Sequence, residues 1–173
     1  NPVGALVTVK CFPWSFEGKS LLIGDASHAV VPFYGQGMNA GFEDITVLDQ
    51  MLEGFEGDDW ETLFKAFERS RKPNADAIAE LSYRNFMEMS SKTADPDFLL
   101  QKKIEKRFAE RHPEKWIPAY RRVTFSDRPY SEALAEGDAQ EGIMRQIMKI
   151  PGIAEKWDSD EVEARMFEPF YTT

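Results

Sequence analysis

The feature that most constrains this chain is a segment in which a short apolar run passes through a glycine- and proline-rich loop into a helix. It begins Ser20-Leu-Leu-Ile-Gly-Asp25-Ala-Ser-His28 and continues, after Ala-Val-Val, as Pro32-Phe-Tyr-Gly35-Gln-Gly37-Met-Asn39-Ala-Gly41-Phe-Glu-Asp44. The run from Ser20 to Ile23 predicts a buried strand, and Gly24 allows the backbone to turn directly after it. The segment therefore predicts a strand–loop–helix unit that can hold a ligand beside the end of the strand.

Several residues of this segment suit the binding of a flavin nucleotide. Asp25 offers two carboxylate oxygens, which can accept hydrogen bonds from sugar-like hydroxyls. Pro32 stiffens the loop, and Gly35 and Gly37 have no side chains that would block a flat ring system. A helix that starts near Gly37 directs unpaired N–H groups and the positive end of its dipole at the ligand. If the ligand is a flavin, these groups would face the N1–C2=O2 edge of its ring, on which negative charge collects when the flavin is reduced.

The same residues resemble the second FAD-binding motif of the single-component aromatic hydroxylases. The resemblance rests on Gly24-Asp25-Ala-x-His28, on Pro32, and on Gly35-Gln-Gly37-Met-Asn39-Ala-Gly41-x-x-Asp44. Within that family, the chain is most similar to the members that hydroxylate L-kynurenine. Two later segments share this similarity: Leu81-Ser-Tyr-Arg-Asn85-Phe-Met-Glu-Met89 and Trp116-Ile-Pro-Ala-Tyr120-Arg-Arg-Val-Thr-Phe125-Ser. The resemblance covers residues 1 to about 130 and implies site residues on both sides of the flavin.

The resemblance implies a cofactor site and a substrate site. The implied cofactor residues are Gly24, Asp25, Pro32, Gly35, Gln36, Gly37, Met38 and Asn39. The implied substrate residues are Asn85 and Tyr120, which would bind the substrate carboxylate, with Pro32 and Phe33 as apolar wall. In the implied reaction NADPH reduces FAD, the reduced flavin takes up O2, and a C4a-hydroperoxide hydroxylates L-kynurenine to 3-hydroxykynurenine. No side chain acts as a nucleophile in this scheme, and no residue of the chain can be assigned to NADPH.

Hydrophobic periodicity predicts a mostly helical chain. We expect strands at Ala5–Cys11 and Ser20–Ile23. We expect helices from Gly37 to an end at Gly54, from Trp60 to a break or kink at Pro73, from Asn74 to Ser91, and from a start within Ala94–Asp97 to His112, with short helical pieces after that. The expected fold class is α+β, mostly α, as the C-terminal part of a Rossmann-like flavin-hydroxylase fold. Residues 1–55 would complete its FAD-binding domain, and residues 56–173 would form a helical region that contributes to the substrate pocket.

One competing motif can be excluded. Gly35-x-Gly37-x-x-Ala40 formally fits the dinucleotide fingerprint G-x-G-x-x-G/A, but that fingerprint requires a strand that ends at the first glycine. Here Asp25 to Tyr34 intervene. The family's own N-terminal fingerprint, which would hold the ADP half of FAD, does not occur in the 173 residues. We therefore expect the chain to be the C-terminal portion of a longer enzyme, to need the N-terminal portion as its partner, and to be inactive alone.

Three polar residues allow a structural interpretation beside the functional one. His28 has no second ligand at metal spacing, so we predict no metal site and expect a structural histidine packed behind the loop. Gln36 and Asn39 could serve only as helix caps. Asn85 lies on a helical line with apolar residues, so the pattern alone fits a hydrogen-bonded core asparagine as well as a substrate ligand.

Two other functions stay open at this stage. A flavin hydroxylase that acts on a phenolic acid would share the glycine motifs but not the segments around Asn85 and Tyr120. Alternatively, the chain could be a helical fragment without activity.

Composition limits the partners. The chain has 30 acidic and 21 basic residues, a net charge of -9, which disfavours nucleic acid and anionic membranes. The lone Cys11 cannot form an intrachain disulfide, and no apolar run has the length of a membrane span. Eukaryotic members of the family have a hydrophobic C-terminal anchor, whereas this chain has the acidic stretch Asp158–Glu168. We therefore expect a bacterial, cytoplasmic enzyme.

Overall fold

A computed structural model describes residues 4–171 of the chain, and side chains as far as residue 168. The contacts divide the chain into two compact units. The first unit consists of Asn1–Phe86 with Pro129–Ser131, and the second unit consists of Met87–Arg128 with Glu132–Thr173. Both units are dominated by helices, which confirms the mostly helical prediction.

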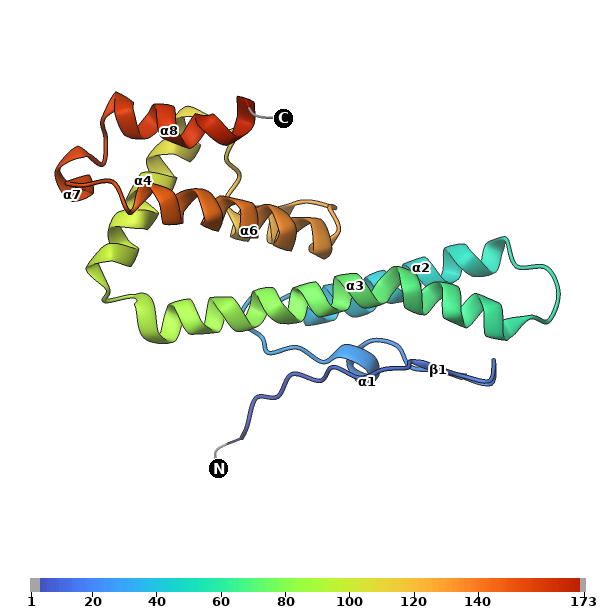
Figure 1. Cartoon of the computed structure of the whole chain (residues 1–173). Helices are drawn as coiled ribbons and strands as arrows, with labels where there is room; N and C mark the ends of the chain where they lie inside the picture. Colours follow the sequence, from blue (N-terminus) through green and yellow to red (C-terminus); the bar gives the residue numbers. More distant parts are fainter. Residues whose placement is uncertain (1–3, 172–173) are drawn as a thin grey trace. The chain divides into compact units, whose positions relative to one another are not determined.

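The first unit contains a small hairpin and three helices. Strands β1 (Ser15–Phe16) and β2 (Ser20–Leu21) pair antiparallel, with Ser15 opposite Leu21. The helices are α1 (Asp25–His28), α2 (Gly37–Glu53) and α3 (Trp60–Met87). Helices α2 and α3 lie side by side and are joined by a loop at one end (Figure 1). Helix α2 begins at Gly37 and has Gly54 as its C-cap, as the sequence predicts.

The core of the first unit fixes the hairpin to the two long helices. Trp14, Phe67 and Ala75 are buried together, and the residues packed against them are Cys11, Leu21, Ile23, Val47, Leu48 and Met51. One carboxylate oxygen of Glu68, on α3, accepts hydrogen bonds from the backbone N–H groups of Trp14 and Ser15. The chain therefore enters Gly24 from a hairpin that is held by both packing and hydrogen bonds.

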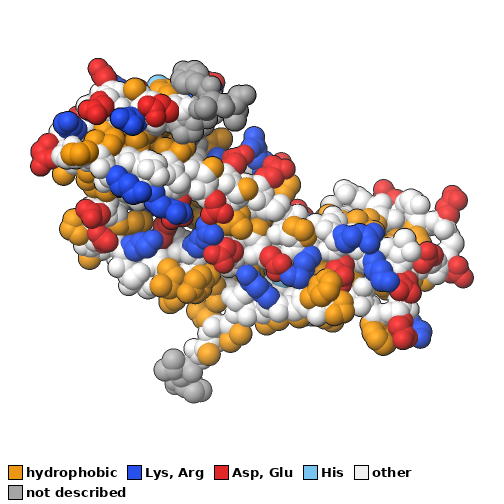
Figure 2. Space-filling view, viewed as in Figure 1, with side chains coloured by type: hydrophobic (Ala, Val, Ile, Leu, Met, Phe, Trp, Pro, Cys, Tyr) orange, Lys and Arg blue, Asp and Glu red, His pale blue; other side chains and the backbone are white. Residues whose placement is uncertain are grey.

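The predicted strand at Ala5–Cys11 is wrong. This segment has no strand, and the one backbone hydrogen bond that it makes to another part of the described chain runs from Val9 N to Ala29 O, at 2.7 Å. A strand needs a neighbouring strand for its remaining N–H and C=O groups, and the described residues provide none beside this segment. Its apolar side chains, including Leu6 and Val7, are mostly exposed. Figure 2 shows hydrophobic surface beside the start of the described chain.

The second predicted strand is shorter than expected. Only Ser20 and Leu21 pair with β1, so Asp25 does not follow a strand directly but is the first residue of α1.

The predicted break at Pro73 is wrong, because α3 continues through it, whereas the alternative of a kink there stays a prediction. Proline removes one backbone donor from a helix and disfavours the preceding turn. Here Phe67 before the proline and Ala75 and Ile78 after it are buried on the same helix, so packing on both sides keeps the helix continuous. The helix ends in one turn of π-helix, η1 (Glu88–Lys92).

The second unit is a group of helices around its own core. They are α4 (Pro96–Arg111), α5 (Ala119–Phe125), α6 (Tyr130–Ile147), α7 (Ile153–Lys156) and α8 (Asp160–Tyr171). The Asp95 carboxylate caps α4 by accepting from Asp97 N at 2.9 Å, and His112 is its C-cap, close to the predicted bounds. Helix α6 has 18 residues, so the prediction of only short pieces after His112 is wrong. The core residues are Ile104, Phe108, Trp116, Met144, Ile147, Val162 and Met166.

Within residues 4–171, no helix combines the length and the apolar character that crossing a membrane requires.

Candidate functional site

The glycine turn that precedes α1 exposes Asp25. Gly24 has φ +58° and ψ −140°, a conformation that side chains rarely allow. Its carbonyl accepts hydrogen bonds from Ser27 N at 2.9 Å, His28 N at 3.0 Å and Ser27 Oγ at 2.9 Å, which closes the turn. Asp25 is exposed at the start of the turn and has no hydrogen-bond or ion-pair partner among the described residues. Its carboxylate is therefore available to a ligand.

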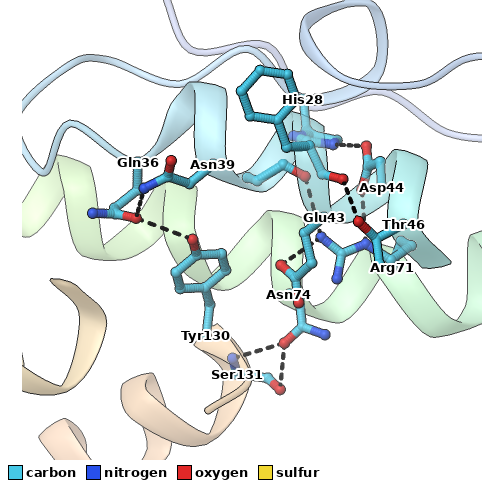
Figure 3. A network of polar contacts seen from close by, with 12 residues as sticks. His28, Gln36, Asn39, Glu43, Asp44, Thr46, Arg71, Asn74, Tyr130 and Ser131 are labelled. Carbon is cyan, nitrogen blue, oxygen red and sulfur yellow. Dashed lines mark hydrogen bonds and ion pairs between the residues drawn. The ribbon is translucent and has the colours of Figure 1, made fainter. Parts of the chain in front are cut away.

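A buried carboxylate on α2 holds this turn in place. Asp44 Oδ2 accepts the Gly24 N–H at 2.9 Å and lies 2.6 Å from His28 Nε2. Asp44 Oδ1 accepts Arg71 Nε, from α3, at 2.7 Å. Asp44 is fully buried and Arg71 is 2% exposed. One side chain thus connects the Gly24 turn, α1 and α3, as Figure 3 shows for His28, Asp44 and Arg71.

The positive charge of Arg71 in this cluster is matched by two carboxylates. Burial alone would raise the pKa of Asp44, but the hydrogen bonds from His28, Arg71 and Gly24 lower that pKa below its ordinary value of 3.8. Burial alone would lower the pKa of Arg71, and its contacts with Glu43 and Asp44 raise it instead. Arg71 Nη2 lies 2.8 Å from Glu43 Oε2, so two carboxylates face one guanidinium. The cluster is therefore ionised at neutral pH and has no excess positive charge from Arg71.

Gly24 and Gly41 allow the turn to approach α2 closely. A Cβ atom added to Gly41 would lie 3.8 Å from the Gly24 Cα, and one added to Gly24 would lie 4.0 Å from the Gly41 Cα. Side chains larger than a methyl group would therefore separate the two backbones. This contact brings the turn that exposes Asp25 beside the second turn of α2.

The loop between α1 and α2 is fixed by a residue of α3. The Asn85 Nδ2 group donates to the Phe33 carbonyl at 2.7 Å, and the rings of Phe33 and Phe86 lie 4.7 Å apart. The Gly35 N–H donates to the Pro32 carbonyl at 3.2 Å, and Gly35 has φ +67° with open space where a side chain would be. One side of the loop is thus held by α3, while Gly35 leaves the space beside it open.

The first residues of α2 present hydrogen-bond donors. The first helical hydrogen bond runs from Ala40 N to Gln36 O at 2.9 Å, so the N–H groups of Gly37, Met38 and Asn39 precede the helical ladder. The Gln36 side chain is 6% exposed and does not cap the helix. Its Oε1 atom instead accepts hydrogen bonds from Asn39 Nδ2 at 2.8 Å and from the Tyr130 hydroxyl at 3.2 Å.

The structure brings most of the predicted site residues together within the first unit. Gly24 and Asp25 lie at the turn, and Pro32, Phe33, Gly35, Gln36, Gly37, Met38 and Asn39 form the loop and the start of α2. Asn85 contacts this loop but is only half-buried. On the same helical line Ile78 and Leu81 are buried and Met89 is 57% exposed, so the buried stripe ends before Asn85. Tyr120 belongs to the second unit, where it is 55% exposed and its ring lies 6.3 Å from that of Phe125.

His28 has the structural role that the sequence predicts. It is buried, its ring lies 5.4 Å from the Trp14 ring, and its Nε2 atom contacts Asp44. Among residues 4–171, no three His, Cys, Asp or Glu side chains are arranged to bind a metal ion.

Sequence reasoning does not predict four residues of the site: Glu43, Asp44, Arg71 and Tyr130. Asp44 enters the sequence argument only as the end of the motif. The sequence does carry a signal for Arg71, because this residue lies four positions after Phe67 and four positions before Ala75, and all three share one helical face. No local signal identifies Tyr130, which reaches Gln36 from 94 residues along the chain.

Comparisons with known proteins point in one direction. Residues 12–82 match a family model described as an FAD binding domain. The matched range continues past residue 55 into α3, so the domain boundary that we expect after residue 55 stays a prediction. The chain is 67% identical over 168 residues to a kynurenine 3-monooxygenase of Flavobacterium johnsoniae, covering 97% of this chain and 37% of that protein. It is 64% identical over 166 residues to one of Christiangramia forsetii, with 96% and 37% covered. It is 44% identical over 147 residues to one of Legionella pneumophila, with 85% and 32% covered. The chain thus spans about a third of the length of these relatives.

The Asp44 cluster makes a first prediction. Asp44→Asn removes the negative charge between His28 and Arg71 and leaves a buried guanidinium with fewer partners. We expect the free energy of unfolding to fall by about 3–5 kcal/mol, as for other buried ion pairs that lose one member. Urea unfolding at neutral pH measures this loss. Asp49→Asn, an exposed change on the same helix, is the matched control and should stay within about 0.5 kcal/mol of wild type.

The lowered pKa of Asp44 makes a second prediction. A carboxyl whose pKa is lower in the folded state contributes stability that is complete above its unfolded pKa and is lost as the pH falls through the folded value. Below about pH 4, the wild-type protein should therefore lose stability more steeply than Asp44→Asn, so that the two free energies of unfolding converge. Asp49→Asn should keep the wild-type slope. Parallel acid profiles for wild type and Asp44→Asn would contradict the prediction.

Proposed function

We propose that this chain, a relative of the bacterial kynurenine 3-monooxygenases, is part of an FAD- and NADPH-dependent enzyme that hydroxylates L-kynurenine to 3-hydroxykynurenine. The observation that carries this proposal is the 67% identity to one such enzyme over 97% of the chain. The relatives named above share this one description, which does not favour a hydroxylase of phenolic acids. The cytoplasmic location expected from the sequence stays a prediction.

The geometry of the first unit suits a flavin. Asp25 offers a carboxylate without a partner in the described chain, which suits the hydroxyls of the ribityl chain. The N–H groups at the start of α2 suit the carbonyl and ring-nitrogen edge of the isoalloxazine, and the open space at Gly35 leaves room for the ring. We assign cofactor contacts to Gly24, Asp25, Pro32, Gly35, Gln36, Gly37, Met38 and Asn39. FAD, when bound, would supply the redox chemistry with NADPH and O2.

The contribution of this chain to the reaction is binding and orientation. Pro32 and Phe33 would form apolar wall beside the aromatic ring of the substrate and keep water from the reacting atoms. Asn85 and Tyr120 would bind the substrate carboxylate. Asn85 already donates one N–H to the Phe33 carbonyl, so its Oδ1 atom and its second N–H remain for a ligand or for water. In this proposal Asn85 has two functions, because it holds the loop and also contacts the substrate.

The exposed apolar side chains of α2 support the proposal that this chain is part of a longer enzyme. While Val47, Leu48 and Met51 pack inward, the helix exposes Met38, Phe42, Ile45 and Leu52. A stripe of this kind on one helix is costly in water and favours burial against another part of a protein. The relatives extend over more than twice the length of this chain. We therefore assign the cover of this stripe to the portion of the enzyme that those additional residues form.

The role of Asp25 can be tested in the full-length enzyme that carries this sequence. Asp25→Ala removes an acceptor for the ribityl hydroxyls, and a hydrogen bond to a charged group contributes about 1.5–3 kcal/mol. The dissociation constant of FAD should therefore rise by roughly 10- to 100-fold. Flavin fluorescence titration measures it, and Asp49→Ala is the matched control. An unchanged dissociation constant would remove Asp25 from the cofactor site.

The substrate role of Asn85 and Tyr120 can be tested separately from the flavin. Asn85→Ala and Tyr120→Phe should each lower kcat/KM for L-kynurenine by roughly 10- to 100-fold, mainly through KM, while the flavin spectrum stays as in wild type. Tyr83→Phe, at an exposed tyrosine, is the control.

A kynurenine analogue without the carboxylate separates the two functions of Asn85. The effect of both substitutions should nearly vanish with this analogue, because the group that they bind is absent. If the Asn85→Ala loss persists with the analogue, then Asn85 acts by holding the Phe33 loop and not by binding the carboxylate.

A further inference from the structure

Tyr130 is a buried residue of the first unit that comes from a distant part of the sequence. It is the first residue of α6, yet Pro129–Ser131 pack with the first unit. Its hydroxyl donates to Gln36 Oε1 at 3.2 Å, across 94 residues of sequence. The contact is buried, so water does not compete strongly for this hydrogen bond.

The position of Tyr130 is fixed by its neighbour. Asn74 Oδ1, on α3, accepts hydrogen bonds from Ser131 N at 3.1 Å and from Ser131 Oγ at 2.9 Å. The segment is thus attached at two points, through Asn74 on α3 and through Gln36 before α2, and Figure 3 shows both. The Asn74 contacts do not depend on the Tyr130 hydroxyl, so they hold the segment even when that hydroxyl is removed.

These contacts determine which way the Gln36 amide faces. An amide oxygen has two lone pairs, and those of Gln36 Oε1 are used by the Tyr130 hydroxyl and by Asn39 Nδ2 at 2.8 Å. The Nε2 group of Gln36 has no partner in the part of the chain that the structure describes, although the residue is only 6% exposed. Nε2 is not among the side-chain atoms that are fully buried without a partner, so water or a ligand can reach it. The amide therefore directs a donor toward solvent or a ligand outside the described chain.

The environment of Tyr130 keeps its hydroxyl a donor. Burial raises the pKa of Tyr130, the nearby carboxylate of Glu43 raises it further, and Arg71 opposes these effects only in part. The phenol therefore stays protonated at neutral pH and can donate to Gln36 Oε1.

We propose that Tyr130 is a positioning residue of the cofactor site, which orients the Gln36 amide so that its Nε2 group donates to an acceptor atom of the isoalloxazine. The inference rests on the proposed function, because it requires a flavin in front of Gln36. Tyr130 touches Gln36 and acts only through it. Without the hydroxyl, Oε1 keeps only the hydrogen bond from Asn39, so the amide is held less firmly and turns its oxygen toward the flavin more easily.

A double-mutant cycle in the full-length flavoenzyme tests this arrangement. The variants are Tyr130→Phe, Gln36→Met and both together, and the readouts are the dissociation constant of FAD and the visible absorption band of the bound flavin. Each single change should weaken FAD binding by roughly threefold to tenfold, as the loss of one hydrogen bond implies, and should shift the band. Because Tyr130 acts through Gln36, Tyr130→Phe should have no further effect in the Gln36→Met background.

The control is Tyr83→Phe, the same chemical change at an exposed tyrosine of the first unit, which should leave both readouts as in wild type. Thermal unfolding of the variants shows whether the fold is kept. The absorption band is measured on bound flavin, so it does not depend on the folded fraction. If Tyr130→Phe does not fold, Asn74→Ala replaces it, because it loosens the Pro129–Ser131 segment and should shift the band in the same direction.

The outcomes separate the inference from the proposed function. A wild-type enzyme that binds no FAD would overturn both. An enzyme that binds FAD, but in which Tyr130→Phe and Gln36→Met have additive effects, would overturn the positioning role and leave the cofactor proposal intact. The same holds if Tyr130→Phe, or Asn74→Ala in its place, changes neither readout.

Discussion

The carboxylate of Asp44 is the interaction on which the first unit depends. It is buried between α2 and α3, and it accepts from the Gly24 N–H, contacts His28 and pairs with Arg71. A buried charge is costly unless its partners are complete, and here each oxygen has at least one donor. Because these donors come from separate segments, the carboxylate is satisfied only when the Gly24 turn is seated against α2. The same requirement fixes where Asp25 is exposed.

The parts of this arrangement that the sequence predicts are those with local signals. Helix α2 has periodic apolar residues and a glycine at its end, so its bounds of Gly37 and Glu53 follow from nearby residues. The strand at Ala5–Cys11 fails because an alternating pattern does not supply a partner strand. The break at Pro73 fails because burial on both sides of the proline outweighs a local preference. The contact of Tyr130 with Gln36 has no local signal at all.

The site shows a clear difference between satisfied and unsatisfied polar groups. Asp44 and Arg71 are buried, and their partners come from the chain itself. Asp25 and the Nε2 group of Gln36 have no partner among the described residues, and both belong to the segments that Asp44 and Tyr130 hold in place. Polar groups whose hydrogen bonds are complete therefore hold in place two groups that have no partner in the described chain. This is the pattern expected of a preorganised binding site, in which the ligand completes the hydrogen bonds.

The charges of the site determine how it would stabilise the reduced flavin that we propose it binds. Arg71 is the guanidinium nearest to the Gly24 turn in the hydrogen-bond network, and it is already paired with Glu43 and Asp44. It therefore has little positive charge to offer to a ligand. Within the described chain, negative charge on a ring in front of α2 would instead be stabilised by oriented dipoles, namely the N–H groups at the start of the helix and the amide of Gln36. Dipoles act only when they point in the right direction, so the residues that orient Gln36 matter as much as the residues that contact the ring.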